Sequence, residues 1–265
     1  MSASAALEIS TRHGWLVGFG NMVAKEYASW WRTRRAVVHL LLWLFVINAF
    51  ILLIGLDEGP AGGRNSPLEL LEELIEIFIR VGGLFATIGI VVATQSTVVS
   101  ERQLGTAEWV LSKPVSRPAF LLSKFVVNGA SFIWLAVAVP ATVFYLQTLL
   151  HAYVQPALLP FLAGMLLHIQ HLLFYLAFTL MLGTFFHGRG AVSGIAIGFL
   201  FGGLILPSFF PWMTGWLPWA LPSLAAMAAQ QQPLPAGSVI AIIISLLWTL
   251  LCILVALWRF EREEF

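Results

Sequence analysis

Charged residues are scarce in this sequence of 265 residues. Asp, Glu, Lys and Arg together make up 10% of the chain, whereas roughly 25% is usual in soluble globular proteins. So few charges cannot cover the surface of a water-soluble protein of this length, and that class is excluded. The formal net charge is only +1, which also excludes a basic nucleic-acid-binding protein.

Cysteine is nearly absent, and the common catalytic motifs are missing. Cys252 is the only cysteine, so a disulfide scaffold and a cysteine-based zinc site are excluded. No G-x-x-x-x-G-K-[ST] phosphate loop occurs, and the chain therefore cannot hydrolyse ATP by that route. An intramembrane enzyme needs a nucleophile with a base or a pair of acids inside the bilayer. No G-x-S-x-G motif, H-E-x-x-H motif or membrane-embedded Asp is present.

Long apolar runs are what the sequence has in abundance. Hydrophobic residues make up 59% of it, and a membrane-spanning helix needs about 20 consecutive, mainly apolar residues. Because the backbone must satisfy its own hydrogen bonds in lipid, such runs form helices. We therefore predict an all-α polytopic membrane protein, with one transmembrane domain over residues 1–265. Its six predicted membrane helices are Ala36–Leu56, Ile77–Val99, Phe125–Leu150, Phe161–Phe186, Ala191–Phe210 and Gly237–Trp258.

The basic residues predict the orientation. With the N-terminus inside, all of the 14 Lys and Arg residues except Arg64 and Arg80 fall on cytoplasmic segments. Positively charged loops stay in the cytoplasm. We therefore expect both chain ends to lie inside.

The loop 100–124 between the second and third predicted helices carries several helix signals. Gly105 suits the left-handed conformation that ends a helix. Thr106 is then expected to cap a short new helix, with Glu108 in its first turn and Pro114 stopping it. An interfacial helix that only anchors the loop would show the same pattern.

The second half of this loop predicts the start of the third membrane helix. Ser116 is a candidate N-cap, and Pro118 is tolerated in the first turn. The short helix before it offers Leu104, Trp109 and Val110 as apolar contacts.

This loop resembles that of ABC-2 type transporter permeases. The positions that carry the resemblance are Glu101, Gly105, Thr106, Pro114, Ser116, Arg117 and Lys124. The resemblance implies that the loop contains a coupling helix, including Glu108, that docks on a separate ATPase subunit. It also implies that residues 1–35 form an amphipathic interface segment in the cytoplasm.

The resemblance further implies the cofactors and partners. ATP and Mg²⁺ would be bound by the ATPase subunit and none by this chain, which would not be an enzyme by itself. A second permease copy or a paralogue would complete the complex in the cell membrane of a prokaryote. The permease of the nitrous oxide reductase maturation transporter is a similar family member, in which ATP would act on an outer partner.

Two outer segments are predicted from their composition. Asp57–Glu76 is acidic, and Ser66 with Glu69 reads as a capping box. It predicts an amphipathic helix that lies on the outer surface and runs into the second membrane helix. Its acidic face is either simply solvated or collects cations or a partner. The segment 211–236 is rich in Pro and Trp and predicts short re-entrant helices or, alternatively, a loop that rests at the membrane interface.

Small and polar residues mark two of the predicted helices. Four glycines recur every four residues on the fifth helix, which favours close helix approach, either within one subunit or in a dimer. They are Gly190, Gly194, Gly198 and Gly202. His168 and His171 lie three apart on the fourth helix. A metal site would need a third ligand, so we expect these histidines to bond neighbouring helices or to line a cavity.

The function favoured by the sequence is therefore a permease subunit that couples ATP hydrolysis by another chain to export. The alternative within the family is a complex that acts on an extracytoplasmic protein. A secondary transporter or channel is disfavoured, because no Asp or Glu relay crosses the predicted helices.

Overall fold

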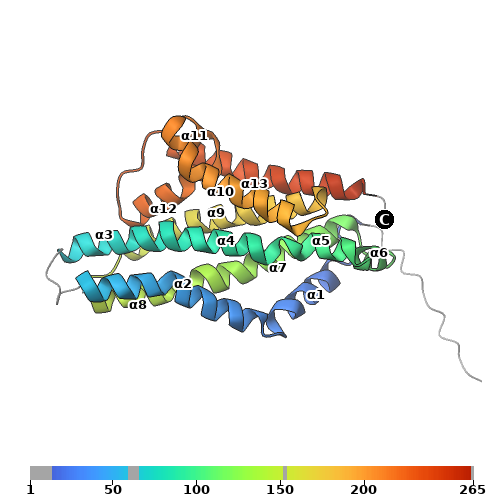
Figure 1. Ribbon diagram of the computed structural model, residues 1–265, viewed down its shortest axis with the longest axis horizontal. Coiled ribbons are helices and arrows are strands. Elements are labelled where there is room, and N and C mark those ends of the chain that lie inside the picture. The colour runs from blue at the N-terminus through green and yellow to red at the C-terminus, as the bar shows by residue number, and fades with distance from the viewer. Residues whose placement is uncertain (1–13, 59–65, 152–153, 264–265) are drawn as a thin grey trace, which may run out of the picture.

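The computed structural model describes residues 14–58, 66–151 and 154–263, and within these ranges it contains helices and no strand. Most of the helices run side by side along one axis (Figure 1). Two segments inside longer helices, η1 and η2, are π-helical, and η3 is a 3₁₀ turn. The elements are α1 (Phe19–Trp31), α2 (Arg35–Glu58), α3 (Pro67–Ile77), η1 (Phe78–Gly82), α4 (Gly83–Thr94), α5 (Ser96–Gln103), α6 (Thr106–Leu111), α7 (Arg117–Phe132), η2 (Ile133–Ala138), α8 (Val139–His151), α9 (Leu158–Phe185), α10 (Arg189–Phe209), α11 (Met213–Trp216), η3 (Pro218–Ala220), α12 (Leu221–Ala229) and α13 (Ser238–Glu261).

Six helical stretches are long and apolar enough to cross a membrane, which confirms the predicted all-α polytopic class. They are Arg35–Leu56, Pro67–Gln103, Arg117–Leu150, Leu158–Phe185, Arg189–Phe209 and Ser238–Glu261. The protein is therefore a multi-pass membrane protein. The second stretch extends beyond its predicted helix at both ends, whereas the third begins earlier, at Arg117, and ends at the predicted Leu150.

Both ends of the described chain lie at the same end of the bundle. The backbone N–H of Ser116 donates to the carbonyl of Val17 at 2.9 Å, and the Arg117 guanidinium donates to the carbonyl of Phe260 at 3.3 Å. The start of α1, the turn before α7 and the end of α13 therefore meet there. We call this region, with α5 and α6, the terminal end (Figure 1). An even number of crossings requires this arrangement.

The acidic segment runs directly into the second span, as the sequence predicted. From Pro67 to Gln103 the chain forms one continuous helical stretch, so α3 extends the axis of the second span. The reason is its apolar face, which packs on α2 and α12 and holds the helix upright. The capping box itself is confirmed, since Ser66 and Glu69 bond each other's backbone N–H. The loop 59–65, with Arg64, lies outside the described residues.

The segment 211–236 forms short broken helices, as predicted. α11, η3 and α12 follow one another, and α12 packs against α9. Gly164 on α9 permits this contact, because a Cβ there would come within 2.5 Å of the Ala225 carbonyl oxygen. α9 also contacts α4, α10 and α13. It is thus the central helix of the bundle.

Candidate functional site

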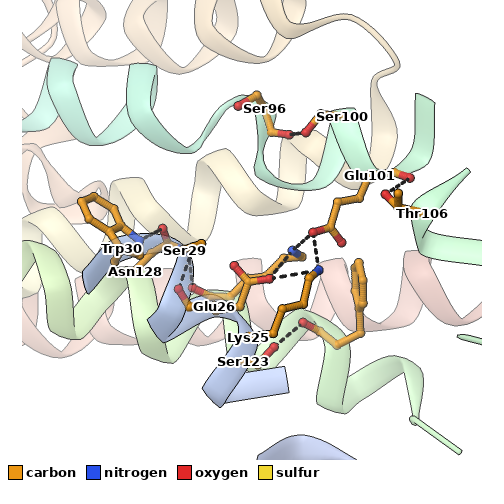
Figure 2. A network of polar contacts seen from close by, with 12 residues as sticks. Lys25, Glu26, Ser29, Trp30, Ser96, Ser100, Glu101, Thr106, Ser123 and Asn128 are labelled. Carbon is orange, nitrogen blue, oxygen red and sulfur yellow. Dashed lines mark hydrogen bonds and ion pairs between the residues drawn. The ribbon is translucent and has the colours of Figure 1, made fainter. Parts of the chain in front are cut away.

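Four charged side chains from three helices meet at the terminal end. Lys25 and Glu26 lie on α1, Glu101 on α5 and Lys124 on α7 (Figure 2). The Lys124 ammonium lies 2.8 Å from a Glu26 carboxylate oxygen and 3.0 Å from a Glu101 carboxylate oxygen. The Lys25 ammonium lies 2.7 Å from the same Glu101 oxygen. We call these four residues the charge cluster; its two cations balance its two anions.

Burial makes this cluster energetically important. The Lys124 side chain is 1% exposed and the Glu26 side chain 8%, so both charges have lost most of their hydration. A buried ion pair is only weakly stabilising as a whole, but removal of one partner leaves an uncompensated charge. The second carboxylate oxygen of Glu101 is buried and has no hydrogen-bond partner. The three helices are therefore held in one relative position by charges that must stay paired.

The amphipathic face of α1 explains why Glu26 is buried. Met22, Glu26 and Trp30 are its buried residues, and their spacing of four places them on one face. This face packs against α7. There the Trp30 indole N–H donates to the Asn128 side-chain oxygen at 2.9 Å, and the Asn128 amide donates to the Lys124 carbonyl at 2.6 Å. α1 is thus fixed to α7 by polar as well as apolar contacts.

The turn between α5 and α6 follows the predicted glycine conformation. Gly105 has φ of +66°, in the left-handed region, and it is the N-cap of α6. Thr106 is not the cap, which corrects the prediction. Its hydroxyl instead donates back to the Glu101 carbonyl at 3.1 Å, because Thr106 already lies in the helix. Glu108 lies in the first turn of α6, as expected.

α6 presents an apolar surface outward. Leu104 just before it is 75% exposed and Trp109 is 63% exposed, whereas Ala107 and Val110 face the protein. The Lys113 ammonium lies 3.5 Å from the centroid of the Trp109 ring. An exposed Trp next to a cation on a braced helix is typical of a protein-docking surface. We call Leu104, Trp109 and Lys113 the α6 surface.

The return from α6 into the membrane is anchored to both chain ends. α6 ends at Leu111, before Pro114. The Ser116 cap is confirmed: its hydroxyl accepts from the Ala119 N–H at 3.2 Å and donates to the Trp15 carbonyl at 2.6 Å. Pro114 lies against the start of α1, where its carbonyl would meet a Cβ on Gly18.

Two arginines connect this region to the last helix. Arg117 donates to the carbonyls of Phe260 and Glu261 at the end of α13. Arg102, which the sequence did not single out, donates to the Gly183 carbonyl at 3.0 Å and pairs with the Glu263 carboxylate. The ends of α9 and α13 are thereby joined to α5.

The structure therefore brings together six of the predicted coupling residues. Glu101 and Lys124 pair directly, while Thr106, Pro114, Ser116 and Arg117 hold the turns around them. Gly105 shapes the turn, and Glu108 is exposed. Glu26 was missed as a site residue. The available signal was an acid at the centre of the apolar face of an amphipathic helix.

The glycines of α10 do not pack inside this subunit, with one exception. A Cβ at Gly190, Gly194 or Gly198 would meet no atom within 4 Å, whereas Gly202 lies near the Trp219 ring. Packing within one subunit is therefore wrong for three of the four positions. Among the residues that the structure describes, no group of three His, Cys, Asp or Glu side chains is placed to hold a metal ion.

Comparison with known proteins identifies the family. The family model described as "ABC-2 family transporter protein" matches residues 18–265, which include all six candidate spans, the charge cluster and the α6 surface. No curated protein matches the sequence. With nearly its whole length covered by this match, the chain belongs to the ABC-2 family of transporter proteins.

Proposed function

We propose that this chain is the membrane-spanning subunit of an ATP-binding-cassette exporter, and that a separate ATPase subunit docks on the α6 surface. The single observation that carries the proposal is that α6 is firmly connected to several other helices. It is joined by a tight turn to α5, and the charge cluster ties α5 to α1 and α7. A displacement of α6 would therefore be transmitted to several membrane helices at once.

The proposed division of labour follows from the residues. The ATPase subunit would hold ATP and Mg²⁺, since this sequence has no phosphate loop. The terminal end would face the cytoplasm, as the basic residues predict. Gly190, Gly194 and Gly198 leave an open strip on α10, which suits contact with a second permease copy or a paralogue. The complex would lie in the cell membrane of a prokaryote.

Docking is tested with a matched pair of tryptophans. Trp109 and Trp258 are 63% and 50% exposed, and each lies beside a cation, Lys113 or Arg262. Trp109→Ala removes a central docking side chain and should weaken ATPase binding by about tenfold or more. Trp258→Ala should leave it unchanged. Affinity is measured on the chain in nanodiscs with a purified ABC ATPase subunit from the same organism. Equal effects of the two variants would contradict the assigned surface.

A second candidate is action on an extracytoplasmic protein, as in a maturation complex. The observation that favours it is the acidic face of α3, whose four Glu side chains are exposed. Its residues are Glu69, Glu72, Glu73 and Glu76. Changing all four to Gln should remove a cross-linked outer partner from the purified complex while ATPase binding stays intact. Identical cross-linking patterns before and after the change argue against this candidate.

A further inference from the structure

A cavity of about 320 Å³ lies in the bundle beneath the broken helices of the segment 211–236. Its walls come from η1, α4, α9, α10, α11 and α12, with Trp219 of η3. This volume is at the lower end of the range for small-molecule sites. The cavity is separate from the charge cluster and is lined within one subunit.

Two buried histidines line this cavity with unused hydrogen-bonding groups. His168 and His171 are each 3% exposed, and the Nδ1 atom of each has no hydrogen-bond partner. The Tyr175 hydroxyl and the Trp219 indole N–H face each other at the same wall, yet neither forms a hydrogen bond of good geometry. Unsatisfied polar groups are costly inside a membrane protein. Their convergence on one cavity indicates a polar ligand.

The backbone leaves room for these side chains. Gly83 faces His168, and a Cβ there would come within 2.7 Å of the imidazole ring. The neighbouring π-helical segment η1 contributes Ile79 and Arg80 to the wall. Single π-helical turns within α-helices often occur at functional sites.

Charge defines the kind of ligand. Arg80 is one of the lining residues and its side chain is about half exposed, while none of the described lining residues is Asp or Glu. Its ion-pair partner, Glu76, lies one turn away outside the lining, at 3.2 Å. Imidazole, hydroxyl and indole groups can all donate hydrogen bonds. The rest of the lining is mainly apolar and includes Leu84, Leu200 and Leu204, with Thr214 and Ser223 as its two hydroxyl residues.

We propose that this cavity binds a small amphiphilic anion, with its carboxylate or similar acidic head at His168, Tyr175 and Arg80 and its apolar body against the leucines. The site goes beyond the coupling function. It requires neither the ATPase nor a second subunit, and its test is independent of both.

The test is equilibrium binding of radiolabelled decanoate to the full chain in phosphatidylcholine nanodiscs. We expect saturable binding above that of empty nanodiscs, with one molecule per chain, and no saturable binding of decyltrimethylammonium. The absence of saturable decanoate binding would overturn the proposal and would indicate that the cavity holds only water. Equal binding of the cation would overturn the assigned ligand chemistry.

Variants locate the binding. Tyr175→Phe and His168→Leu each remove one polar group and should weaken decanoate binding by about fivefold or more. Tyr145→Phe, which changes a tyrosine that does not line this cavity, is the control.

Leu204 is 57% exposed at the cavity rim, so Leu204→Trp should block access without disturbing buried packing. Leu254→Trp, at a similarly exposed position on α13, should not. Unchanged binding in both Tyr175→Phe and Leu204→Trp would place the ligand elsewhere and overturn the proposal.

Discussion

At the scale of single residues, local signals were readable from the sequence and long-range pairings were not. The Ser66 capping box, the Ser116 cap and the Gly105 turn depend on neighbours within a few positions, so residue type and spacing predicted them. The partners of Glu26 and Arg102 are 98 and 161 residues away in the chain. No spacing rule within one segment could reveal these pairs.

Lys124 is the residue whose substitution should destabilise the protein most. Lys124→Met leaves Glu26 and Glu101 buried with only the half-exposed Lys25 between them. We expect the free energy of unfolding to fall by about 3–5 kcal/mol, as for a buried pair that loses one charge. Lys113→Met, at an exposed lysine, is the control and should change it by less than about 0.5 kcal/mol.

The measurement is reversible unfolding in mixed micelles, compared with the wild-type chain. The triple variant with Lys124→Met, Glu26→Gln and Glu101→Gln removes the uncompensated charges. It should recover part of the lost stability. An unfolding free energy that is the same for Lys124→Met and Lys113→Met would show that the charge cluster does not hold the helices together.

At the scale of elements, hydropathy predicted the number and order of the helices but not how they pack. Each apolar run became one span, because length and composition alone decide whether a helix fits the bilayer. The upright position of α3 depends on contacts with α2 and α12, which no single segment encodes. The glycine strip of α10 was equally ambiguous, since the same spacing serves packing inside or between subunits.

Two glycines in the middle of membrane helices should respond oppositely to alanine. A Cβ at Gly89 would lie 1.7 Å from the Trp43 ring, whereas a Cβ at Gly194 would meet nothing within 4 Å. Gly89→Ala should lower the unfolding free energy of the monomer by about 1–3 kcal/mol through overpacking of α4 on α2. Gly194→Ala should leave it unchanged or raise it by up to about 1 kcal/mol, because Ala favours helix.

The comparison uses the same mixed-micelle unfolding, at a detergent concentration that keeps the chain monomeric. If Gly194→Ala destabilised the monomer as much as Gly89→Ala, the open strip on α10 would not exist as described. If Gly89→Ala left the unfolding free energy unchanged, the close packing of α4 on Trp43 would be contradicted.

At the scale of the whole molecule, the family and the six-span architecture are established, and the orientation stays a prediction from the basic residues. The terminal end unites the charge cluster, the α6 surface and the last turn of α13. The cavity with His168 and His171 is lined instead by the middle of the bundle and the broken helices that cover it. The molecule thus has two separate candidate sites, and we propose that the terminal end binds a protein partner and the cavity a small ligand.

Above all, we propose that this subunit works with an ATPase docked at its terminal end. The most direct measurement is the native mass of the complex purified in nanodiscs after co-expression with an ABC ATPase subunit from the same organism. We predict a particle with two copies of this chain, or one copy and a paralogue, and two ATPase subunits. Recovery of this chain alone under the same gentle conditions, with the ATPase expressed and folded, would contradict the claim.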